Sequence, residues 1–230
     1  MLTRSDKTIL DAVEMLHLLR PAGLKHIGFK DVGVAYATLR QLSDAIRAMG
    51  AESYLEVVST SPEESLNSAR VAAEIGVDHL LGGTQVKEIL SITRGSATRY
   101  YPFPGRPFSH PTKLGGTTAA VEADCRRFID LGCAGVDLLA YRATESEPID
   151  LVRAARKGLG AARLIIAGGI DSAARIEAVK EAGADAFTIG TAIFNGSYRD
   201  NLGSPLSQLK AVLDDLDAAT PAAVAATRSA

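Results

Sequence analysis

The stretch that decides the fold is Leu164–Phe194, which reads LIIAGGIDSAARIEAVKEAGADAFTIGTAIF. It begins with an apolar run that ends in a Gly pair, and an Ala-rich amphipathic run follows. A second apolar run then ends at Gly190. A strand, a helix and a further strand in this order predict a βαβ unit, in which the two strands lie parallel in one sheet.

The same unit repeats along the rest of the chain. Apolar runs follow at once after glycines that end helix-like stretches, a position typical of Gly in the left-handed conformation. These glycines are Gly23, Gly50, Gly76, Gly132, Gly160 and Gly183. Gly23 and Gly50 are 27 residues apart, and Gly160 and Gly183 are 23 apart. One βα unit with short loops needs about that many residues.

Counting the apolar runs gives eight predicted strands with helices between them. They lie near Leu2, at His26–Lys30, Tyr54–Val58, His79–Leu81, Arg99–Phe103, Val136–Ala140, Leu164–Ala167 and Phe187–Ile189. Strict alternation allows an open doubly wound sheet or a barrel, and the count of eight favours the barrel. We therefore predict an α/β fold, a single (βα)8 TIM barrel of eight parallel strands over residues 1–217, with an Ala-rich C-terminal tail at 218–230.

Composition excludes several classes of protein. The chain has 230 residues, of which 47% are hydrophobic and 23% charged, and its net charge is −2. This excludes a disordered chain and predicts neither a nucleic-acid nor a membrane partner. Cys125 and Cys133 predict buried thiols in a reducing compartment. Charges at the N-terminus come too early for a secretory signal, so we expect a cytoplasmic protein. Homo-oligomerisation is left open.

Two glycine turns predict a phosphate-binding site. The seventh predicted strand ends in Gly168 and Gly169, and the eighth ends in Gly190 and Thr191. Glycine lets a backbone come close to an oxyanion, and N–H groups at the start of a helix bind anions. In barrels a phosphate site after strands seven and eight is frequent. The alternative is that these glycines only form tight turns.

The motifs GGI, AGAD and IGTAIF in this segment resemble the ribulose-phosphate-binding barrels, a superfamily that includes ribulose-phosphate 3-epimerase and barrels of histidine and tryptophan biosynthesis. The resemblance implies a TIM barrel and a phosphorylated, sugar-like ligand held at Gly168, Gly169, Gly190 and Thr191. In the epimerases a metal-binding acid precedes the Gly pair, whereas this chain has Ala167 there. We therefore expect neither a metal nor another cofactor.

Three ionisable residues lie within apolar strands. Because side chains alternate along a strand, Leu55 and Val57 face the helices and Glu56 points into the barrel. The same reasoning points Lys30 and Asp137 inward, and Tyr141 with them. Buried charges must pair, so these groups form either an ion-pair layer or a catalytic site. We predict Lys30, Glu56 and Asp137 as catalytic residues.

Substrate contacts are expected at the ends of these strands and in the long loop after the fifth one. Tyr141 and Arg142 follow the sixth strand, where barrels bind substrate. Arg106, His110 and Lys113 lie in a Pro- and Gly-rich loop that either closes over an anionic substrate or is a solvated surface loop. We predict that all five residues bind substrate.

These features predict a metal-independent enzyme that acts on a small phosphorylated, carbohydrate-like metabolite. Lys30 beside carboxylates suits lyase chemistry, as an aldolase or decarboxylase, or isomerase chemistry. It would act through a Schiff base or through general acid and base, and we favour the lyase. The alternative is a barrel that binds a phosphometabolite without catalysis, as a sensor or as a subunit of a complex.

Overall fold

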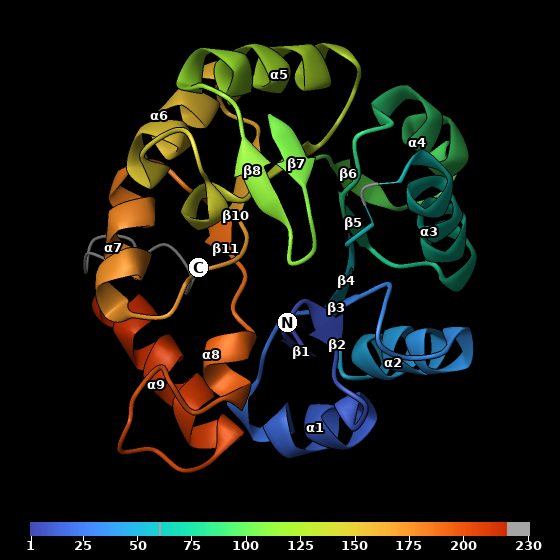
Figure 1. Ribbon diagram of the computed structural model, residues 1–230. Helices are drawn as coiled ribbons and strands as arrows, with labels where there is room; N and C mark the ends of the chain where they lie inside the picture. Colours follow the sequence, from blue (N-terminus) through green and yellow to red (C-terminus); the bar gives the residue numbers. More distant parts are fainter. Residues whose placement is uncertain (60, 220–230) are drawn as a thin grey trace, which may run out of the picture.

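The computed structural model describes residues 1–59 and 61–219 and shows a ring of parallel strands with helices around it (Figure 1). Four neighbouring strands form one parallel sheet, in the order β3 (His26–Lys30), β4 (Glu52–Val57), β5 (His79–Gly82) and β6 (Arg99–Tyr101). Three more form a second parallel sheet, in the order β11 (Ala186–Phe187), β10 (Arg163–Ile166) and β9 (Gly135–Leu138).

Backbone hydrogen bonds join the two sheets into a closed barrel. Between β6 and β9, the N–H of Ala134 donates to the Tyr100 carbonyl over 3.0 Å, and the N–H of Asp137 donates to the Pro102 carbonyl over 3.1 Å. On the other side, residues 1–3 lie between β11 and β3. The N–H of Leu2 donates to the Gly28 carbonyl over 2.7 Å. Residues 1–3 thus complete the eight strand positions of the predicted (βα)8 barrel.

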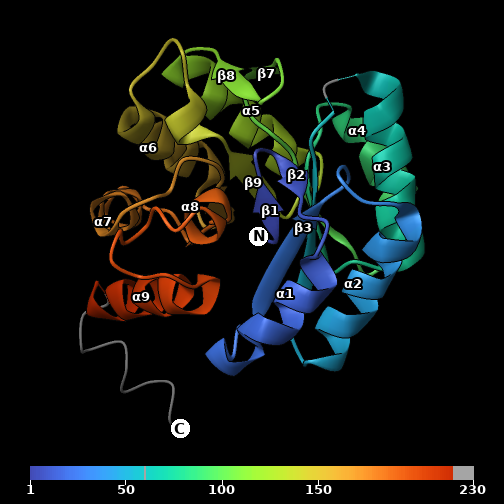
Figure 2. The ribbon, with the colours of Figure 1, turned by 60° about the horizontal axis from the view of Figure 1, so that its bottom comes forward.

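The first strand continues into a short hairpin, which lies inside the ring between α8 and β3 (Figure 2). Its two strands are β1 (Thr3–Arg4) and β2 (Lys7–Thr8), paired antiparallel. The turn residues Ser5 and Asp6 have φ angles of 49° and 63°. Two left-handed residues in a row are what a tight two-residue hairpin requires, and Asp tolerates that conformation better than most side chains.

Helices follow the strands as predicted and cover the outside of the barrel. They are α1 (Ala12–Leu19), η1 (Arg20–Ala22), α2 (Tyr36–Ala48), α3 (Pro62–Ile75), α4 (Val86–Thr93), α5 (Thr118–Asp130), η2 (Ala140–Arg142), α6 (Pro148–Leu159), α7 (Ala173–Glu181), α8 (Thr191–Phe194) and α9 (Pro205–Ala218). The six glycines predicted to end helices all have positive φ. None of the helices in residues 1–59 and 61–219 has both the length and the apolar character needed to cross a bilayer.

Side-chain alternation divides the apolar residues between two cores. Leu55 and Val57 of β4 pack outward among the residues of the helices, whereas Tyr54 packs in a smaller interior cluster with Leu81, Tyr101 and Ile165. The alternation predicted for β4 is therefore confirmed. Cys125 and Cys133 are free and buried, as expected, and burial raises the pKa of both thiols to about 12.

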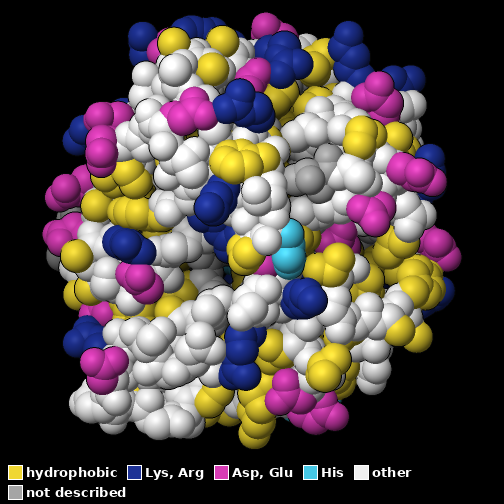
Figure 3. Space-filling model, viewed as in Figure 1, with side chains coloured by type: hydrophobic (Ala, Val, Ile, Leu, Met, Phe, Trp, Pro, Cys, Tyr) yellow, Lys and Arg dark blue, Asp and Glu magenta, His cyan; other side chains and the backbone are white. Residues whose placement is uncertain are grey.

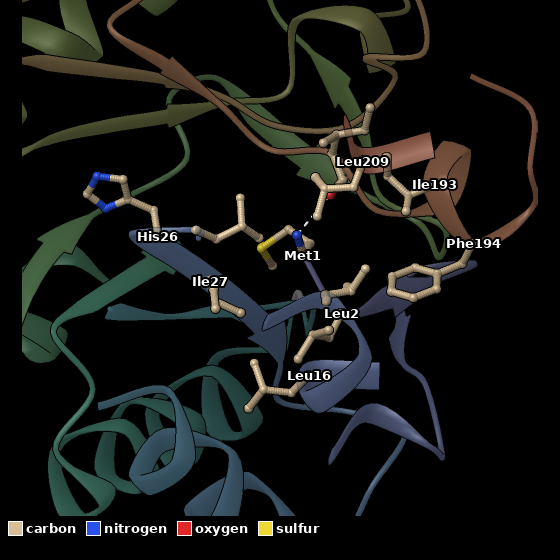
Figure 4. A pocket seen from close by; sticks show the side chains of 11 residues that line it. Met1, Leu2, Leu16, His26, Ile27, Ile193, Phe194 and Leu209 are labelled. Carbon is tan, nitrogen blue, oxygen red and sulfur yellow. Dashed lines mark hydrogen bonds between the residues drawn. The ribbon is translucent and has the colours of Figure 1, made fainter. Parts of the chain in front are cut away.

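The start of the chain is held by apolar contacts and by one polar contact. Figure 4 shows Leu2, Leu16 and Leu209 around a small cavity of about 40 Å³, where the first strand meets α1 and α9. The Met1 nitrogen donates to the Ile189 carbonyl over 2.8 Å. These contacts fix the first strand against β11 and so position the hairpin that follows it.

Two sequence expectations need comment. The long loop expected after the fifth strand contains an antiparallel hairpin of β7 (Arg106–Phe108) and β8 (Lys113–Gly115), which the sequence analysis did not predict. Pairing between two three-residue strands orders it. Ala218, the first residue of the predicted tail, ends α9, and the rest of that tail from residue 220 on lies outside the described residues.

Candidate functional site

A buried ion cluster lies inside the barrel at the C-terminal ends of its first strands. The Lys30 Nζ donates to Asp6 Oδ1 over 2.7 Å and to Glu56 Oε1 over 2.8 Å. Lys30 ends β3 and Glu56 lies directly opposite it on β4, so the register of the two strands brings them together. All three side chains are at most 5% exposed. The predicted pairing of Lys30 with a carboxylate is confirmed.

Arg142 completes this cluster from the opposite side of the barrel. Its two terminal nitrogens contact the two Asp6 oxygens, NH1 to Oδ2 over 2.7 Å and NH2 to Oδ1 over 2.8 Å. Such a two-point contact holds both groups in one orientation. We refer to Asp6, Lys30, Glu56 and Arg142 as the charged cluster. It balances two cations with two carboxylates, which offsets the cost of their burial.

The β7–β8 hairpin touches the charged cluster through its backbone. The N–H of Thr112 donates to Asp6 Oδ2 over 3.0 Å, and the Thr112 carbonyl accepts from Arg142 over 3.1 Å. Thr112 is 5% exposed, although it belongs to a surface hairpin. The predicted lid therefore lies against the site, and the contact is made by a residue that the sequence did not single out.

The cluster controls the protonation of its members. Burial alone would lower the pKa of Lys30, but the nearby charges of Glu56 and Asp6 outweigh it and raise that pKa. Burial would also raise the pKa of Asp6, yet the hydrogen bonds and charges of Arg142 and Lys30 hold it well below its usual range. Lys30 is therefore an ammonium and Asp6 a carboxylate at neutral pH.

Asp137 lies near the cluster without joining it. Its side chain is fully buried on β9, and neither carboxyl oxygen has a hydrogen-bond partner among the described residues. Burial and the charge of Glu56 raise its pKa well above the usual range, and the charges of Lys30 and Arg142 oppose this only in part. Burial without a partner therefore favours the neutral form of Asp137, which lacks the cationic partner that Glu56 has in Lys30.

A cavity of about 310 Å³ adjoins the charged cluster. Asp6, Lys30, Glu56 and Arg142 line it together with residues 168–171 and 188–192, and Arg142 lies against Gly168. Several Lys and Arg side chains surround the middle of the face shown in Figure 3. Two of the three predicted catalytic residues, Lys30 and Glu56, thus share one cavity with the predicted phosphate loops, whereas Asp137 does not line it. The cavity has the volume of a small-molecule site.

The two loops offer unused backbone donors to this cavity. No hydrogen bond between described residues uses the N–H of Gly169, Thr191 or Ala192. Gly168 and Gly169 have φ angles of 72° and 78°, which favour glycine. Free N–H groups that converge from two loops are the means by which a backbone binds a phosphate.

The glycines also make room for neighbouring residues. A Cβ at Gly168 would lie 2.2 Å from Arg142 Nε, and one at Gly190 would lie 2.4 Å from Thr3 Oγ1. Gly190 therefore lets the first strand approach, in addition to any contact with a ligand. Substituting Gly190 would disturb barrel closure, so Thr191, whose side chain is exposed, is the better position for testing phosphate binding.

The remaining predicted substrate residues do not line the cavity. β9 ends at Leu138, so strand alternation does not extend to Tyr141. This residue lies in η2 with the Arg175 guanidinium 4.6 Å from its ring centre. Arg106 pairs with Glu145 over 2.6 Å, and His110 and Lys113 are exposed on the β7–β8 hairpin. Only Arg142 of the five predicted substrate residues lies in the cavity wall.

Asp6 is the site residue that the sequence analysis missed. It follows the first strand at the end of the barrel where catalytic groups lie, and that position was the available signal. The part of the chain that the structure describes contains no group of three His, Cys, Asp or Glu side chains arranged to hold a metal ion. The expectation of metal independence stays a prediction.

Comparison with solved structures supports the barrel. Orotidine 5′-phosphate decarboxylase from Pyrococcus horikoshii OT3 is 15% identical, with a TM-score of 0.61 over 90% of this chain and 93% of that one. A structure of the BexX/CysO complex of Amycolatopsis orientalis is 18% identical, with a TM-score of 0.62 over 94% of this chain and 89% of that one. A native KDPGal structure is 12% identical, with a TM-score of 0.62 over 90% of each chain.

No protein-family model matches the chain, and no curated protein matches it either. At these identities the structural likeness establishes the fold. It agrees with the resemblance of Leu164–Phe194 to the ribulose-phosphate-binding barrels, and the chain is a TIM-type (βα)8 barrel.

Proposed function

We propose that this barrel is a metal-independent enzyme that acts on a small phosphorylated carbonyl compound by lyase or isomerase chemistry. The observation that carries the proposal is the shared cavity, which is lined both by Lys30 and Glu56 and by the residues that carry the free N–H groups, Thr191 and Ala192. A phosphate bound at these N–H groups would direct the carbon chain of the substrate toward the charged cluster.

Lys30 and Glu56 have complementary roles in this proposal. An ammonium has three N–H groups, and two of those on Lys30 already bond to carboxylates. The third is available for a carbonyl oxygen. Glu56 bonds to Lys30 through Oε1, which leaves Oε2 to accept a proton. Both side chains line the cavity, so one group can stabilise an oxyanion while the other acts as the base.

The chemistry common to both reaction types is the formation of an enolate. In isomerisation, Glu56 takes a proton from the carbon beside the carbonyl. The C–H electron pair forms a C=C bond, and the carbonyl oxygen becomes an oxyanion that Lys30 stabilises. The hydroxyl proton on the first carbon then moves to this oxyanion, and Glu56 returns its proton to the former carbonyl carbon, so that the carbonyl forms at the first carbon. In C–C cleavage, Glu56 takes the proton of a hydroxyl group, whose oxygen forms a new C=O bond as the C–C bond breaks. The electrons of that C–C bond form an enolate, which takes the proton back from Glu56 to complete the reaction.

The state of Lys30 supports acid–base chemistry over a Schiff base. An imine requires a neutral amine as nucleophile, whereas Asp6 and Glu56 raise the pKa of Lys30. Borohydride added together with a phosphorylated ketose should therefore leave the mass of the chain unchanged. A stable adduct that Lys30→Arg abolishes would contradict the acid–base mechanism.

Solvent exchange tests the proposal directly. Small phosphorylated aldoses and ketoses are incubated with the protein in deuterated water, and deuterium at the carbon beside the carbonyl is followed by NMR. We expect exchange or turnover with at least one of them, and a loss of about 10²–10⁴-fold in Glu56→Gln. Glu145→Gln, a matched change outside the cavity, should keep wild-type rates.

Two outcomes would contradict the proposal. Phosphate esters that bind but never exchange or react would favour the non-catalytic barrel. An active protein whose rate is equal in wild type and Glu56→Gln would remove Glu56 from the reaction.

A further inference from the structure

The proposed function does not specify whether the reacting end of the substrate is charged or neutral. The charged groups around the cavity bear on this question. The cavity wall contains two cationic side chains, Lys30 and Arg142. Lys30 already bonds to Asp6 and Glu56, and Arg142 holds both oxygens of Asp6. Both cations of this wall are thus neutralised by carboxylates before any substrate arrives.

The acids of the same wall are at least as numerous. Besides Asp6 and Glu56, Asp171 lines the cavity. Its partner is Arg175, which lies 2.7 Å away. Burial lowers the pKa of the Met1 amino group to about 6, so this group is mostly uncharged at neutral pH. A carboxylate brought against Lys30 would therefore add a negative charge to a region whose cations are already paired.

Asp137 is a further carboxyl group in the barrel interior, beside the charged cluster. It is fully buried near Lys30 and Glu56 and has no hydrogen-bond partner among the described residues. Burial and the charge of Glu56 raise its pKa well above the usual range, although two cations lie nearby. An interior that provides no hydrogen-bond partner for its own third carboxyl group offers no compensation for a carboxylate on a ligand.

The two glycine loops that also line the cavity have a different character. Their donors are the backbone N–H groups of Gly169, Thr191 and Ala192, which no described residue occupies. These are neutral donors that do not need a counter-charge from the charged cluster to bind an oxyanion. The cavity is therefore suited to a ligand with an anion at one end only.

We propose that the substrate is a phosphomonoester whose reactive end, against Lys30 and Glu56, is an uncharged carbonyl or polyol, and that the charged cluster rejects ligands with a carboxylate there. This inference rests on the proposed function and narrows it. Decarboxylation and the cleavage of 2-oxo acids place a carboxylate at or beside the reacting carbon, so isomerisation or aldol cleavage of a neutral sugar-like phosphate remains.

The test compares two ligands that differ at one end. Glycerol phosphate ends in a hydroxymethyl group, and phosphoglycerate carries a carboxylate at that place. Calorimetric titration of the wild-type protein at neutral pH should give a Kd for glycerol phosphate at least about tenfold below that for phosphoglycerate, since close like charges in a buried site repel strongly. Inorganic phosphate is titrated as the reference for the phosphate end.

Variants locate the origin of this preference. Glu56→Gln removes one negative charge of the cluster and keeps the shape, so the ratio of the two affinities should fall at least about threefold. Glu145→Gln makes the same chemical change at a residue outside the cavity wall, and the ratio should stay at its wild-type value. Thermal unfolding of each variant confirms that it is folded.

The outcomes separate the two proposals. If phosphate and glycerol phosphate bind and phosphoglycerate binds equally or more tightly, the inference is overturned and the phosphate site stands. If none of the three ligands binds, the phosphate site fails, and the proposed function and the inference fail with it. A wild-type preference that Glu56→Gln leaves unchanged would also overturn the assignment to the charged cluster.

Discussion

The two ends of the barrel interior both carry polar side chains, yet they are built differently. At the C-terminal end the charged cluster pairs Lys30 and Arg142 with carboxylates beside a cavity of about 310 Å³. At the N-terminal end a lower cluster of His26, Glu52, Tyr54 and His79 depends on rings: Tyr54 and His79 stack with centroids 4.0 Å apart and planes at 8°.

The difference lies in what each cluster does with its charge. The His79 Nε2–H donates to Glu52 Oε2 over 2.8 Å, but burial lowers the pKa of His79, so the ring is largely neutral at neutral pH. Lys30 stays charged because two carboxylates hold it so. Strand alternation therefore places polar side chains inside the barrel at both ends. The direction of the strands tells the two clusters apart, because active sites of such barrels lie at the C-terminal ends of the strands.

The largest effect is expected from breaking the charged cluster. Asp6→Ala leaves Lys30 and Arg142 buried without their shared counter-charge, so the free energy of unfolding should fall by about 3–5 kcal/mol. Asp171→Ala removes an acid whose pair with Arg175 is about half exposed, and it should cost at most about 1 kcal/mol. Urea unfolding of both variants gives the comparison, and equal costs would refute a structural role for Asp6.

A smaller loss is expected at the lower cluster, and it should affect stability alone. His79→Gln removes the stack on Tyr54 and weakens the contact with Glu52, which should lower the free energy of unfolding by about 1–2 kcal/mol. Turnover and KM should match wild type. Lys30→Arg should show the reverse, a folded protein without activity, because a planar guanidinium cannot take the place of the compact ammonium between Asp6, Glu56 and a substrate oxyanion. A loss of turnover in His79→Gln would extend the site to the lower cluster.

Asp137 should make stability depend on pH. Its pKa is raised in the folded state, so the folded chain keeps a proton that the unfolded chain releases above about pH 4. Stability therefore falls as pH rises between the two pKa values, by about 1.4 kcal/mol per pH unit.

Asp137→Asn has no such proton, and its stability relative to wild type should increase from pH 4 to pH 7. Denaturant unfolding at several pH values measures this, with Asp171→Asn as the control. Parallel curves for wild type and Asp137→Asn would contradict the assignment of a buried neutral acid.

The smallest expected effect is that of chelation. The charged cluster and the backbone donors supply the groups that the proposed reaction uses, and Ala167 stands where a metal-binding acid would be. Activity on a phosphorylated substrate should therefore be the same with and without EDTA. A loss that zinc or manganese restores would assign the chemistry to a metal.

The sequence predicted the barrel because each helix end and strand leaves a local signal. The Gly residues after the helices and the apolar runs beside them required no knowledge of distant contacts. Lys30 and Glu56 were found by alternation within β3 and β4, because an ionisable residue among apolar neighbours is conspicuous. The phosphate loops were found by their glycines for the same reason.

The rest of the site depends on contacts between residues far apart in sequence, and the position of Asp6 after the first strand is a weak signal beside them. Asp6 lies in a two-residue turn, where Asp is common for backbone reasons alone, and its partner Arg142 is 136 residues away in sequence. Thr112 enters the site through its backbone N–H and carbonyl, so its side chain gives no indication. Tyr141 was misjudged because β9 ends before it.

The central claim is that a phosphate binds at the C-terminal end of the barrel, beside the charged cluster, and not at the lower cluster. Titration of the isotope-labelled protein with inorganic phosphate, followed by amide NMR, tests it most directly. We predict saturable shifts at the amides of Gly169, Thr191 and Ala192 and none at Tyr54 or His79. The affinity should be lower in Thr191→Asp than in its neutral control Thr191→Asn. Unchanged amides in these loops, or larger shifts around His79, would contradict the account.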